Sequence, residues 1–332
     1  MHAVRKCLAK MTVQALTALV LGNVAMVAGA ADASSYPNRP VHLVVPFPAG
    51  GGADTVGRFL GAKLAERLGQ TVIIENKGGA SGAIGAGYVA NAKPDGLTLL
   101  LGTTPLIQAP VFFKDLPYDA FRDFEPVARI ALSADVLIVP ASSGIESLAQ
   151  LVEAAKKNPG KYNYGTYGNA TSAHMHGELL NYQKNIELLH IPYKGTAPLM
   201  QDFLGGQLTI GLPESVGVRA HLDNPKLKAL AVSGEQRLAT LPDTPTFTEL
   251  GYTDFEPNGW YGIVAPAGTS PAIVNKLSTI LADIMAQPDV QAQFIGMGLS
   301  PGYGNAKQLK DWMQRDSVIW ARMAKLGNIK VQ

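Results

Sequence analysis

The chain has 332 residues, of which 47% are hydrophobic and 16% are charged. This length suffices for two ordinary domains, and this composition excludes an intrinsically disordered protein because it can bury a large core. The formal net charge is only +2, and no basic stripe stands out in the sequence, so no nucleic-acid partner is expected.

The N-terminus has the pattern of a secretory signal peptide. The basic residues Arg5, Lys6 and Lys10 precede an uncharged, largely apolar stretch over 11–27, and a small-x-small cleavage site closes the segment 1–30. The alternative is a membrane anchor, but the apolar stretch is near the lower length limit for a span and contains polar residues. We therefore expect export and removal of the signal, which carries the only cysteine and leaves no thiol or disulfide chemistry.

After this segment, short apolar runs alternate with amphipathic stretches. The strands predicted first cover 41–47, 72–75 and 97–102, and the helices between them cover 54–68 and 83–92. A β-α-β-α-β pattern of this kind is typical of a parallel sheet that is covered by helices on both faces.

The alternation continues in the rest of the chain. The strands predicted there cover 136–139, 162–165, 186–191, 208–212, 227–232 and 260–265. The helices predicted there cover 147–157, 172–182, 196–204, 246–251, 270–286, 289–295 and 307–326. Two successive α/β units without a flexible linker indicate two lobes that are joined by strands. The last two helices follow the last clear strand and are expected on the outside of a lobe.

Four segments of the sequence share a position at the carboxyl end of a predicted strand. They cover 46–55, 102–105, 164–174 and 190–198. Ligands of open α/β sheets bind outside these strand ends. Glycines let the backbone come close to a ligand, and the helix N-termini that follow present free N–H groups and a partial positive charge, which suit an anion. The shared placement therefore predicts one cleft for a carboxylate or a polar head group.

Each of these segments also has an ordinary structural interpretation. Gly-rich strand–helix turns recur in many proteins without a ligand. His174 and His176 are two positions apart, so they leave a helix on different faces and would not chelate one metal together. Capping or packing is the simpler role for both. Lys194 is either a cation for an acid or a solvated side chain, and Tyr193 either walls the pocket or packs in the core.

Motifs of catalysis are missing from the sequence. It contains no nucleophile elbow, no Walker loop, no dinucleotide fingerprint and no zinc-protease motif. No catalytic residue, no metal site and no cofactor are therefore expected, and the chain is predicted not to be an enzyme. A catalytic triad assembled from distant residues stays an open alternative.

Ordered landmark motifs run along nearly the whole chain after the signal. They include Val45-Pro46-Phe47-Pro48-Ala49-Gly50-Gly51, Glu75-Asn76-Lys77-x-Gly79-Ala80, Tyr164-Gly165-x-x-Gly168, Pro192-Tyr193-Lys194-Gly195 and Leu241-Pro242-Asp243-x-Pro245-Thr246. With these motifs the chain resembles the tripartite tricarboxylate transporter substrate-binding proteins, the Bug or TctC family of periplasmic receptors.

This resemblance implies the α/β class and a type II periplasmic binding-protein fold, with two α/β lobes joined by a two-strand hinge. One lobe would consist of residues 36–136 and 260–332, and the other of residues 137–259. The resemblance also implies a periplasmic monomer without a cofactor. Its partners would be a small organic acid and the large and small membrane subunits of a transporter.

The resemblance also implies which residues hold the ligand. The first two segments would line one side of the cleft, and the other two segments and the end of a strand would line the other side. The residues expected to bind the ligand are Phe47, Pro48, Ala49, Gly50, Gly51, Asp54, Thr103, Thr104, Gly165, Thr166, Tyr167, Asn169, Thr171, Ser172, His174, Tyr193, Lys194, Gly195, Thr196 and Glu214. Tyr167 is bulky where the family often has a small residue, so it is expected to reshape the pocket. The family often carries an Asp after the strand that follows Gly205-Gly206-Gln207, where this sequence has Gly211-Leu212-Pro213-Glu214, so a basic amine that would pair with that Asp is not the expected ligand.

Two other functions remain open at this stage. The loaded receptor could feed a sensor kinase instead of a transporter. An exported α/β hydrolase is a further alternative, which the missing nucleophile elbow disfavours.

Overall fold

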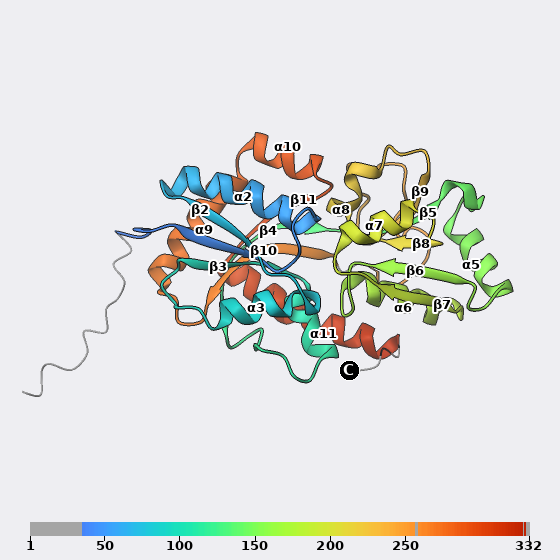
Figure 1. Ribbon diagram of the computed structural model, residues 1–332, viewed down its shortest axis with the longest axis horizontal. Helices are drawn as coiled ribbons and strands as arrows, with labels where there is room; N and C mark the ends of the chain where they lie inside the picture. Colours follow the sequence, from blue (N-terminus) through green and yellow to red (C-terminus); the bar gives the residue numbers. More distant parts are fainter. Residues whose placement is uncertain (1–34, 256–257, 328, 330–332) are drawn as a thin grey trace, which may run out of the picture. The chain divides into compact units, whose positions relative to one another are not determined.

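Two β-sheets organise the part of the chain described by the computed structural model, which comprises residues 35–255, 258–327 and 329 (Figure 1). Both sheets belong to one compact unit that begins at Pro37. The first sheet has the strand order β11-β4-β10-β3-β1-β2. Its strands are β1 (Val41–Val45), β2 (Val72–Asn76), β3 (Thr98–Thr103), β4 (Phe124–Ser133), β10 (Gly259–Pro266) and β11 (Ser300–Asn305). β1 is parallel to β2 and β3, whereas β10 is antiparallel to β3 and β4.

The second sheet has the strand order β7-β6-β8-β5-β9. Its strands are β5 (Val136–Pro140), β6 (Tyr162–Thr166), β7 (Leu188–Pro192), β8 (Ile210–Leu212) and β9 (Leu227–Val232). β6 is parallel to β7 and β8, and β5 is antiparallel to β8 and β9. The predicted mixture of strands and helices is therefore present in both halves of the unit.

Helices cover both faces of the first sheet, as the buried strands require. One face carries α2 (Gly52–Leu68), α9 (Pro271–Met285) and α10 (Pro288–Gly296), and the other carries α3 (Ala83–Ala90), α4 (Pro105–Phe112) and α11 (Ala306–Leu326) (Figure 1). Glycines let α2 lie close to the strands. A Cβ atom at Gly57 would come within 2.6 Å of Val45, and one at Gly61 would come within 2.6 Å of Ile74.

The second sheet is covered in the same way. Its helices are α5 (Leu148–Lys157), α6 (Ser172–Lys184), α7 (Thr196–Leu204) and α8 (Ser215–Val218). Side chains of β5 alternate between two hydrophobic clusters, as a strand period of two dictates. Leu137 and Val139 pack in the cluster that includes α5 and α6, and Val136 and Ile138 pack in the cluster that includes α7.

The chain crosses from the first sheet to the second between Ser133 and Val136, and it returns between β9 and β10. Backbone and side-chain hydrogen bonds tie the crossing segments together. The Asp135 N–H donates to Ser233 Oγ at 2.9 Å, and the Ser233 N–H donates to the Asp135 carbonyl at 2.9 Å. Asp135 also forms an isolated β-bridge with Glu214, which follows β8.

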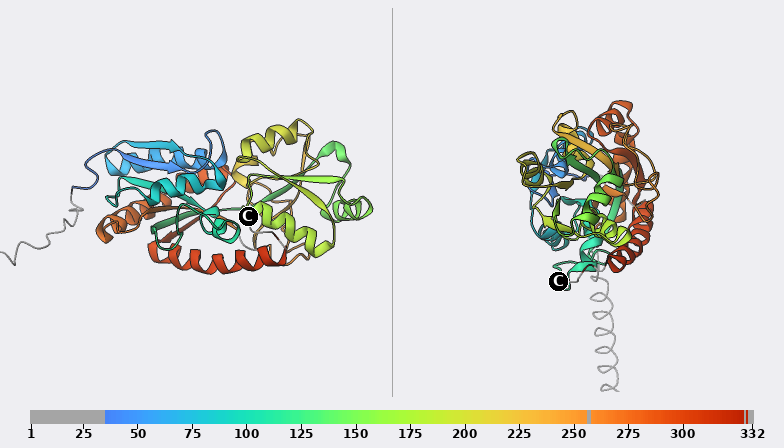
Figure 2. Two further views of the ribbon diagram at one scale, coloured as in Figure 1. Left: turned by 60° about the horizontal axis from the view of Figure 1, so that its bottom comes forward. Right: turned by 90° about the vertical axis from the view of Figure 1, so that its right-hand side faces the viewer.

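Helix α11 contacts elements of both sheets. It packs on β4, β11 and α4 of the first sheet and on α6 of the second, and Figure 2 shows it running along both parts. Trp320, which is fully buried, lies 5.7 Å from the ring of His176 on α6. The helix begins with a capping box formed by Asn305 and Gln308. Its first residue, Ala306, lies one position before the predicted start at residue 307.

Several predicted elements were wrong or missing. The segment 246–251 forms the two capping hydrogen bonds between Thr246 and Glu249, but it makes only a turn because Gly251 follows with φ of 80°. Strand β11 lies after the supposed last strand. Because it contains one Pro and two Gly residues, its sequence does not have the pattern of a strand. These residues are tolerated because β11 is at the edge of the sheet. Helix α4 was missed because it contains Pro110.

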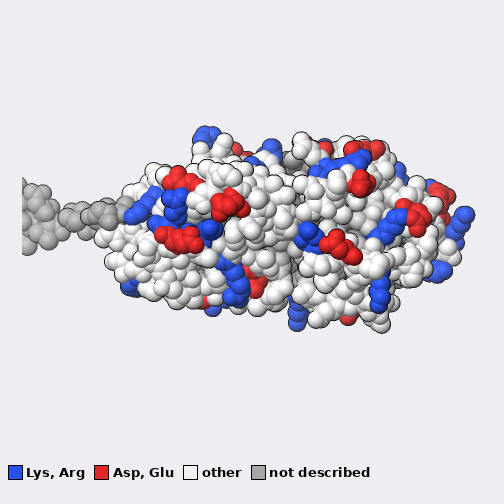
Figure 3. Space-filling model, turned by 90° about the horizontal axis from the view of Figure 1, so that it is seen from above, with Lys and Arg blue, Asp and Glu red and all other residues white. Residues whose placement is uncertain are grey.

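The charged side chains are distributed without a large field of one sign on the face shown in Figure 3. Opposite charges lie next to each other: Lys63 Nζ, for example, is 3.8 Å from Glu66 Oε2 and 3.7 Å from Asp289 Oδ2. Within the described ranges, no helix combines the length and the apolar character that a membrane span needs. The predicted signal peptide, residues 1–30, lies outside the described residues.

Candidate functional site

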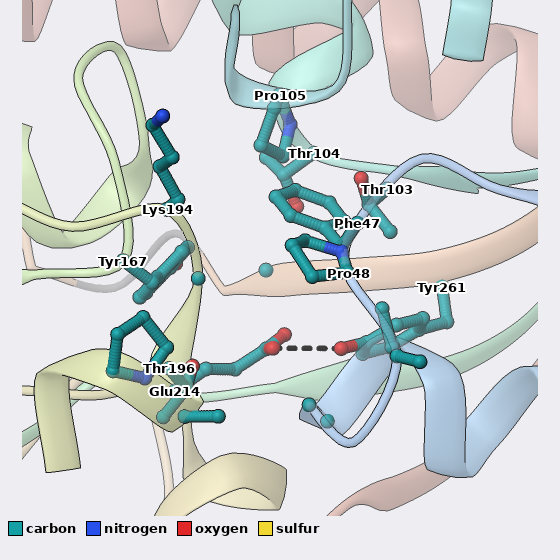
Figure 4. Close-up of a pocket in the computed structure, with 18 residues that line it drawn as sticks. Phe47, Pro48, Thr103, Thr104, Pro105, Tyr167, Lys194, Thr196, Glu214 and Tyr261 are labelled. Atoms are coloured by element: carbon teal, nitrogen blue, oxygen red, sulfur yellow. Dashed lines mark hydrogen bonds between the residues drawn. The ribbon is translucent and has the colours of Figure 1, made fainter. Parts of the chain in front are cut away.

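A pocket lies where strand ends of both sheets meet two helix N-termini (Figure 4). The space within it has a volume of about 550 Å³, including the part that is open to solvent. Its walls come from the loop after β1, the end of β3, the loop before α7, the end of β8 and the start of β10. The lining residues are Phe47, Pro48, Ala49, Gly51, Gly52, Ala53, Thr103, Thr104, Pro105, Tyr167, Lys194, Gly195, Thr196, Ala197, Pro198, Glu214, Gly259 and Tyr261.

The N-terminus of α2 faces this pocket. Its N-cap, Gly51, has an extended backbone and no side chain that could satisfy the first N–H groups of the helix. Gly52 and Ala53, the first two helical residues, line the pocket. The first N–H groups of a helix have no partner within the helix, and they carry the positive end of its dipole. The sequence therefore builds an anion-binding group from backbone alone.

The N-terminus of α7 faces the same pocket from the second sheet. Its N-cap is again a glycine, Gly195, which has φ of 107° and no side-chain cap. The Gly195 N–H is held by the carbonyl of Tyr167 at 3.2 Å, which leaves the helical residues Thr196 and Ala197 to line the pocket. By contrast, α5 and α6 are capped by the side chains of Ser147 and Thr171. The starts of α2 and α7 therefore offer backbone N–H groups to a ligand, whereas the start of α4, which also lacks a side-chain cap and lines the pocket, has Pro105 without an N–H as its first residue.

Glu214 is the acidic side chain of the pocket lining. Its Oε2 accepts a hydrogen bond from the Tyr261 hydroxyl at 2.7 Å, which Figure 4 marks as a dashed line. Burial raises the pKa of Glu214 to about 7, and the nearby charge of Asp135 adds to this effect, whereas hydrogen bonds from Tyr261 and Ser133 oppose it. The carboxyl group therefore changes its ionisation near neutral pH.

A buried hydrogen-bond network holds Tyr167 against the pocket. The Tyr167 hydroxyl donates to Asp135 Oδ1 at 2.9 Å and lies 2.6 Å from Ser172 Oγ. The other oxygen of Asp135 lies 2.8 Å from His176 Nδ1, and all four side chains are buried. Burial raises the pKa of the Tyr167 hydroxyl well above its usual value, and the adjacent Asp135 adds to this effect, so the ring stays neutral. The network fixes the position of the bulky ring that the sequence placed here.

The rest of the lining is mostly apolar or small. Phe47 and Pro48 form one wall, and Pro198 contributes to another. Figure 4 shows the side chain of Lys194 extending away from Glu214. Within the described part of the chain, no ion pair includes Lys194. The positive potential of the pocket therefore comes from the helix N-termini and from this one side chain.

The structure brings together eleven of the twenty residues expected to bind the ligand. These are Phe47, Pro48, Ala49, Gly51, Thr103, Thr104, Tyr167, Lys194, Gly195, Thr196 and Glu214. The other nine do not line the pocket. These are Gly50, Asp54, Gly165, Thr166, Asn169, Thr171, Ser172, His174 and Tyr193.

Asp54 organises the loop after β1. Its carboxylate accepts hydrogen bonds from the Gly50 N–H, from Arg58 Nε and from Asn76 Nδ2, each at 2.9 Å. Burial by itself would raise the pKa of Asp54, but these hydrogen bonds outweigh it and hold the pKa below its usual value. The ionised carboxylate therefore fixes the backbone of the loop that carries Gly51.

The remaining outer residues pack or cap. His174 stacks on His190 with ring centroids 4.0 Å apart, and burial lowers the pKa of His174 to about 4. Thr171 caps α6 by accepting from the His174 N–H. The Tyr193 hydroxyl donates to Asp202 at 2.7 Å, outside the pocket lining.

Some residues that line the pocket were not predicted from the sequence as site residues. Gly52 and Ala53 belong to a segment already singled out, so only their individual roles were missed. Gly259 and Tyr261 were predicted as part of a strand. They reach the pocket because β10 lies between β3 and β4, a strand order that no local pattern reveals. Of the residues that the structure describes, no three His, Cys, Asp or Glu side chains come together as a metal site.

Residues 56–329 of the chain match the model of the tripartite tricarboxylate transporter family receptor. The periplasmic binding protein BugD is a similar solved structure, with 36% sequence identity and a TM-score of 0.84 over 90% of this chain and 100% of that chain. The match to the family model begins within α2, and the structural match to BugD covers 90% of this chain.

Two further solved structures contain carboxylates. The R. palustris protein Rpa4515 with adipate has 30% identity and a TM-score of 0.86, and the match covers 90% of this chain and 100% of that chain. MatC from Rhodopseudomonas palustris with bound malate has 30% identity and a TM-score of 0.80, with 87% and 99% covered. These likenesses confirm the predicted fold class and the predicted family resemblance.

Proposed function

Because the chain belongs to the tripartite tricarboxylate transporter receptor family, we propose that it binds a small carboxylate-bearing solute in this pocket and delivers it to a transporter. The family and the fold are those of binding proteins rather than enzymes. The observation that supports the proposal best is the convergence of two uncapped helix N-termini, those of α2 and α7, on one pocket. The adipate and malate complexes of similar proteins agree with it.

The proposed mechanism is capture by closure. We assign residues 36–136 and 260–332 to one lobe and 137–259 to the other, with the crossings between the sheets as the hinge. The ligand carboxylate receives N–H groups from a helix of each lobe, so it stabilises the closed arrangement over the open one. One hydrogen bond already joins the two proposed lobes: Ser81 Oγ donates to the carbonyl of Asn169 at 2.5 Å. No chemical step is required, and the protein is proposed to act as a monomer without a metal or cofactor.

The cellular setting follows from the same family. We propose that the first 30 residues direct export, that the mature protein works in the periplasm, and that its partners are a large and a small membrane subunit. The loaded, closed protein would present a surface to these subunits that the open protein lacks.

A melting-shift screen of the chain from residue 31 onward tests the proposed ligand class. Mono-, di- and aromatic carboxylates are compared with neutral solutes such as sugars. A ligand at about 100 times its Kd stabilises a 1:1 complex by about 2.7 kcal/mol, so at least one acid is expected to raise the Tm by several degrees. If a neutral solute stabilised the protein and none of the acids did, the proposal that the ligand carries a carboxylate would be rejected.

A proline variant tests the role of the helix N-terminus. Thr196→Pro removes the first N–H of α7, at a position where proline suits the helix. Losing a hydrogen bond to a charged group is expected to weaken acid binding about tenfold or more. Ala306→Pro makes the same change at the first position of α11, away from the pocket lining, and should leave the affinity unchanged. Equal affinities of both variants would show that this N–H group does not hold the ligand.

A further inference from the structure

Tyr167 separates the pocket from two buried polar side chains. Its own side chain lines the pocket, whereas Ser172 and Asp135 do not. The Tyr167 hydroxyl donates to Asp135 Oδ1 at 2.9 Å and lies 2.6 Å from Ser172 Oγ. Ser172 is 1% exposed and Asp135 is 2% exposed. The phenol therefore fills the space between the pocket and this polar pair.

The ring accounts for the small contribution of the loop after β6 to the pocket. Within the segment 164–174, the lining includes Tyr167 and none of the small polar residues that were expected beside it. Ser172 is the first residue of α6, and its hydroxyl contacts the phenol. A small side chain at position 167 would therefore open a further space at the start of α6.

Hydrogen bonds and packing hold the ring in place. Asp135, which accepts from the Tyr167 hydroxyl, is itself fixed by His176, whose Nδ1 lies 2.8 Å from Asp135 Oδ2. Tyr167 also belongs to the hydrophobic cluster that includes Ala173 and Leu179 of α6. If the ring moved aside, the buried carboxylate of Asp135 would lose one of its donors, which is costly. The ring is therefore a fixed wall of the pocket.

This wall lies next to the proposed carboxylate site. The Tyr167 carbonyl accepts the N–H of Gly195, the N-cap of α7, at 3.2 Å. Phe47 and Pro48 line the same pocket from the loop after β1 (Figure 4). A Cβ atom at Gly195 would lie 3.8 Å from Pro48 Cδ, so the two loops approach each other closely. The carbon chain of an acid held at the start of α7 is therefore enclosed between side chains of both sheets.

We propose that Tyr167 is a specificity-determining residue, which restricts the ligand to short carboxylic acids and excludes longer ones. This inference rests on the proposed function and narrows its substrate class. The phenol takes the place that the far end of a longer acid would occupy. A buried cavity of about 150 Å³ is enough to hold benzene, so removal of the ring should make room for several more carbon atoms of a ligand.

Acids of increasing length test this inference. One series is butyrate, hexanoate and octanoate, and the other is succinate, adipate and suberate, so each series has four, six and eight carbon atoms. Isothermal titration is carried out on the wild-type chain, on Tyr167→Ala and on Tyr167→Phe. Tyr252→Ala is the matched control, because Tyr252 is 6% exposed, belongs to the same hydrophobic cluster and does not line the pocket.

In at least one series, the wild type is expected to bind the four-carbon acid about tenfold or more tightly than the eight-carbon acid. Tyr167→Ala should remove or reverse this preference, because the longer chain then enters the space of the phenol. Tyr167→Phe keeps the ring and loses only the hydroxyl, so the preference should follow the ring and persist. Tyr252→Ala removes a buried tyrosine elsewhere and should not change the preference.

A second variant covers the case in which Tyr167→Ala does not fold. Tyr167→Leu keeps apolar bulk in the cluster but is shorter than the phenol, so it should shift the preference towards longer acids in the same direction.

The failures are distinguishable. The role of Tyr167 is rejected, while the carboxylate receptor stands, if the wild type binds eight-carbon acids as tightly as four-carbon acids. The same holds if the shortened side chains keep the wild-type preference, if Tyr167→Phe loses it, or if Tyr252→Ala changes it as much as Tyr167→Ala does. If none of the six acids binds but another acid of the melting-shift screen does, this inference alone is rejected. If no acid binds in either experiment, the inference and the proposed acid ligand are rejected together.

Discussion

His174 and His190 stack face to face, and one further aromatic ring contacts each of them. Their ring centroids are 4.0 Å apart, with Tyr164 next to His190 and Phe112 next to His174. Burial lowers the pKa of His174 to about 4, and burial together with the neighbouring His174 lowers that of His190 to about 3. Both rings are therefore neutral at pH 7, which is the condition for two imidazoles to stack face to face.

This stack predicts a loss of stability in acid. The pKa of both groups is lower in the folded chain than the ordinary value of 6.5. Their contribution is therefore complete above about pH 6.5 and is lost as the pH falls through about 4 and then 3, because the unfolded chain takes up both protons first. In this window the two groups lower the free energy of unfolding by up to roughly 2.7 kcal/mol per pH unit.

The test compares denaturant unfolding of the wild type and of His174→Gln between about pH 7 and pH 4. The variant should lose about half of the acid slope that the two histidines cause. Glu214 has the opposite sign, since its raised pKa adds stability as the pH falls from about 7, but it is common to both proteins and cancels in the comparison. Parallel pH profiles would contradict a neutral buried His174.

At the scale of elements, the start of α2 is shaped by contact with α8 across the pocket. A Cβ atom at Gly52 would come within 2.4 Å of Val216 Cγ1 and within 3.2 Å of the Gly217 backbone nitrogen. Gly52 does not have a positive φ, so the backbone itself accepts alanine. The glycine is therefore needed for the approach of the two helices rather than for the local conformation.

Gly52→Ala is expected to hold the two sides of the pocket apart. Since opening relieves the clash, the free energy of unfolding should change little, within about 1 kcal/mol, while the affinity for the acid falls about tenfold or more. Gly296→Ala, where a Cβ meets nothing within 4 Å, is the control and should change neither quantity. The measurements are denaturant unfolding and isothermal titration. Unchanged affinity of the Gly52 variant would show that this contact is not part of the ligand-bound state.

The elements also show how far the sequence could predict the site. The strand–turn–helix segments around Gly51 and Gly195 follow from local periodicity and turn chemistry, and residues of both segments line the pocket, while their contact with a ligand stays a prediction. Asp135 was not predicted, because its role depends on contacts with Tyr167 and His176, which are 32 and 41 positions away. His174 was expected to cap or pack as its simpler role, and its ring packs on that of His190.

At the scale of the whole chain, the order of strands decides where the site lies. The first sheet inserts β10, which comes late in the sequence, between β3 and β4. Tyr261 on β10 thereby reaches Glu214, which follows β8 of the second sheet. The sequence predicted two α/β units with loops at their strand ends, but only the non-local strand order explains how one hydrogen bond links the two sheets at the pocket. Closure around a ligand would therefore involve both sheets and the crossings between them.

The most direct test of this account is a crystal structure of the chain from residue 31 onward with the acid that raises its Tm most. The ligand carboxylate is expected between the N-termini of α2 and α7, with its oxygens within about 3 Å of the first backbone nitrogens of both helices. A carboxylate bound elsewhere, for example in the groove beside Trp312, or one that touches only one of the two helices, would contradict the central claim that these helix starts jointly hold the ligand.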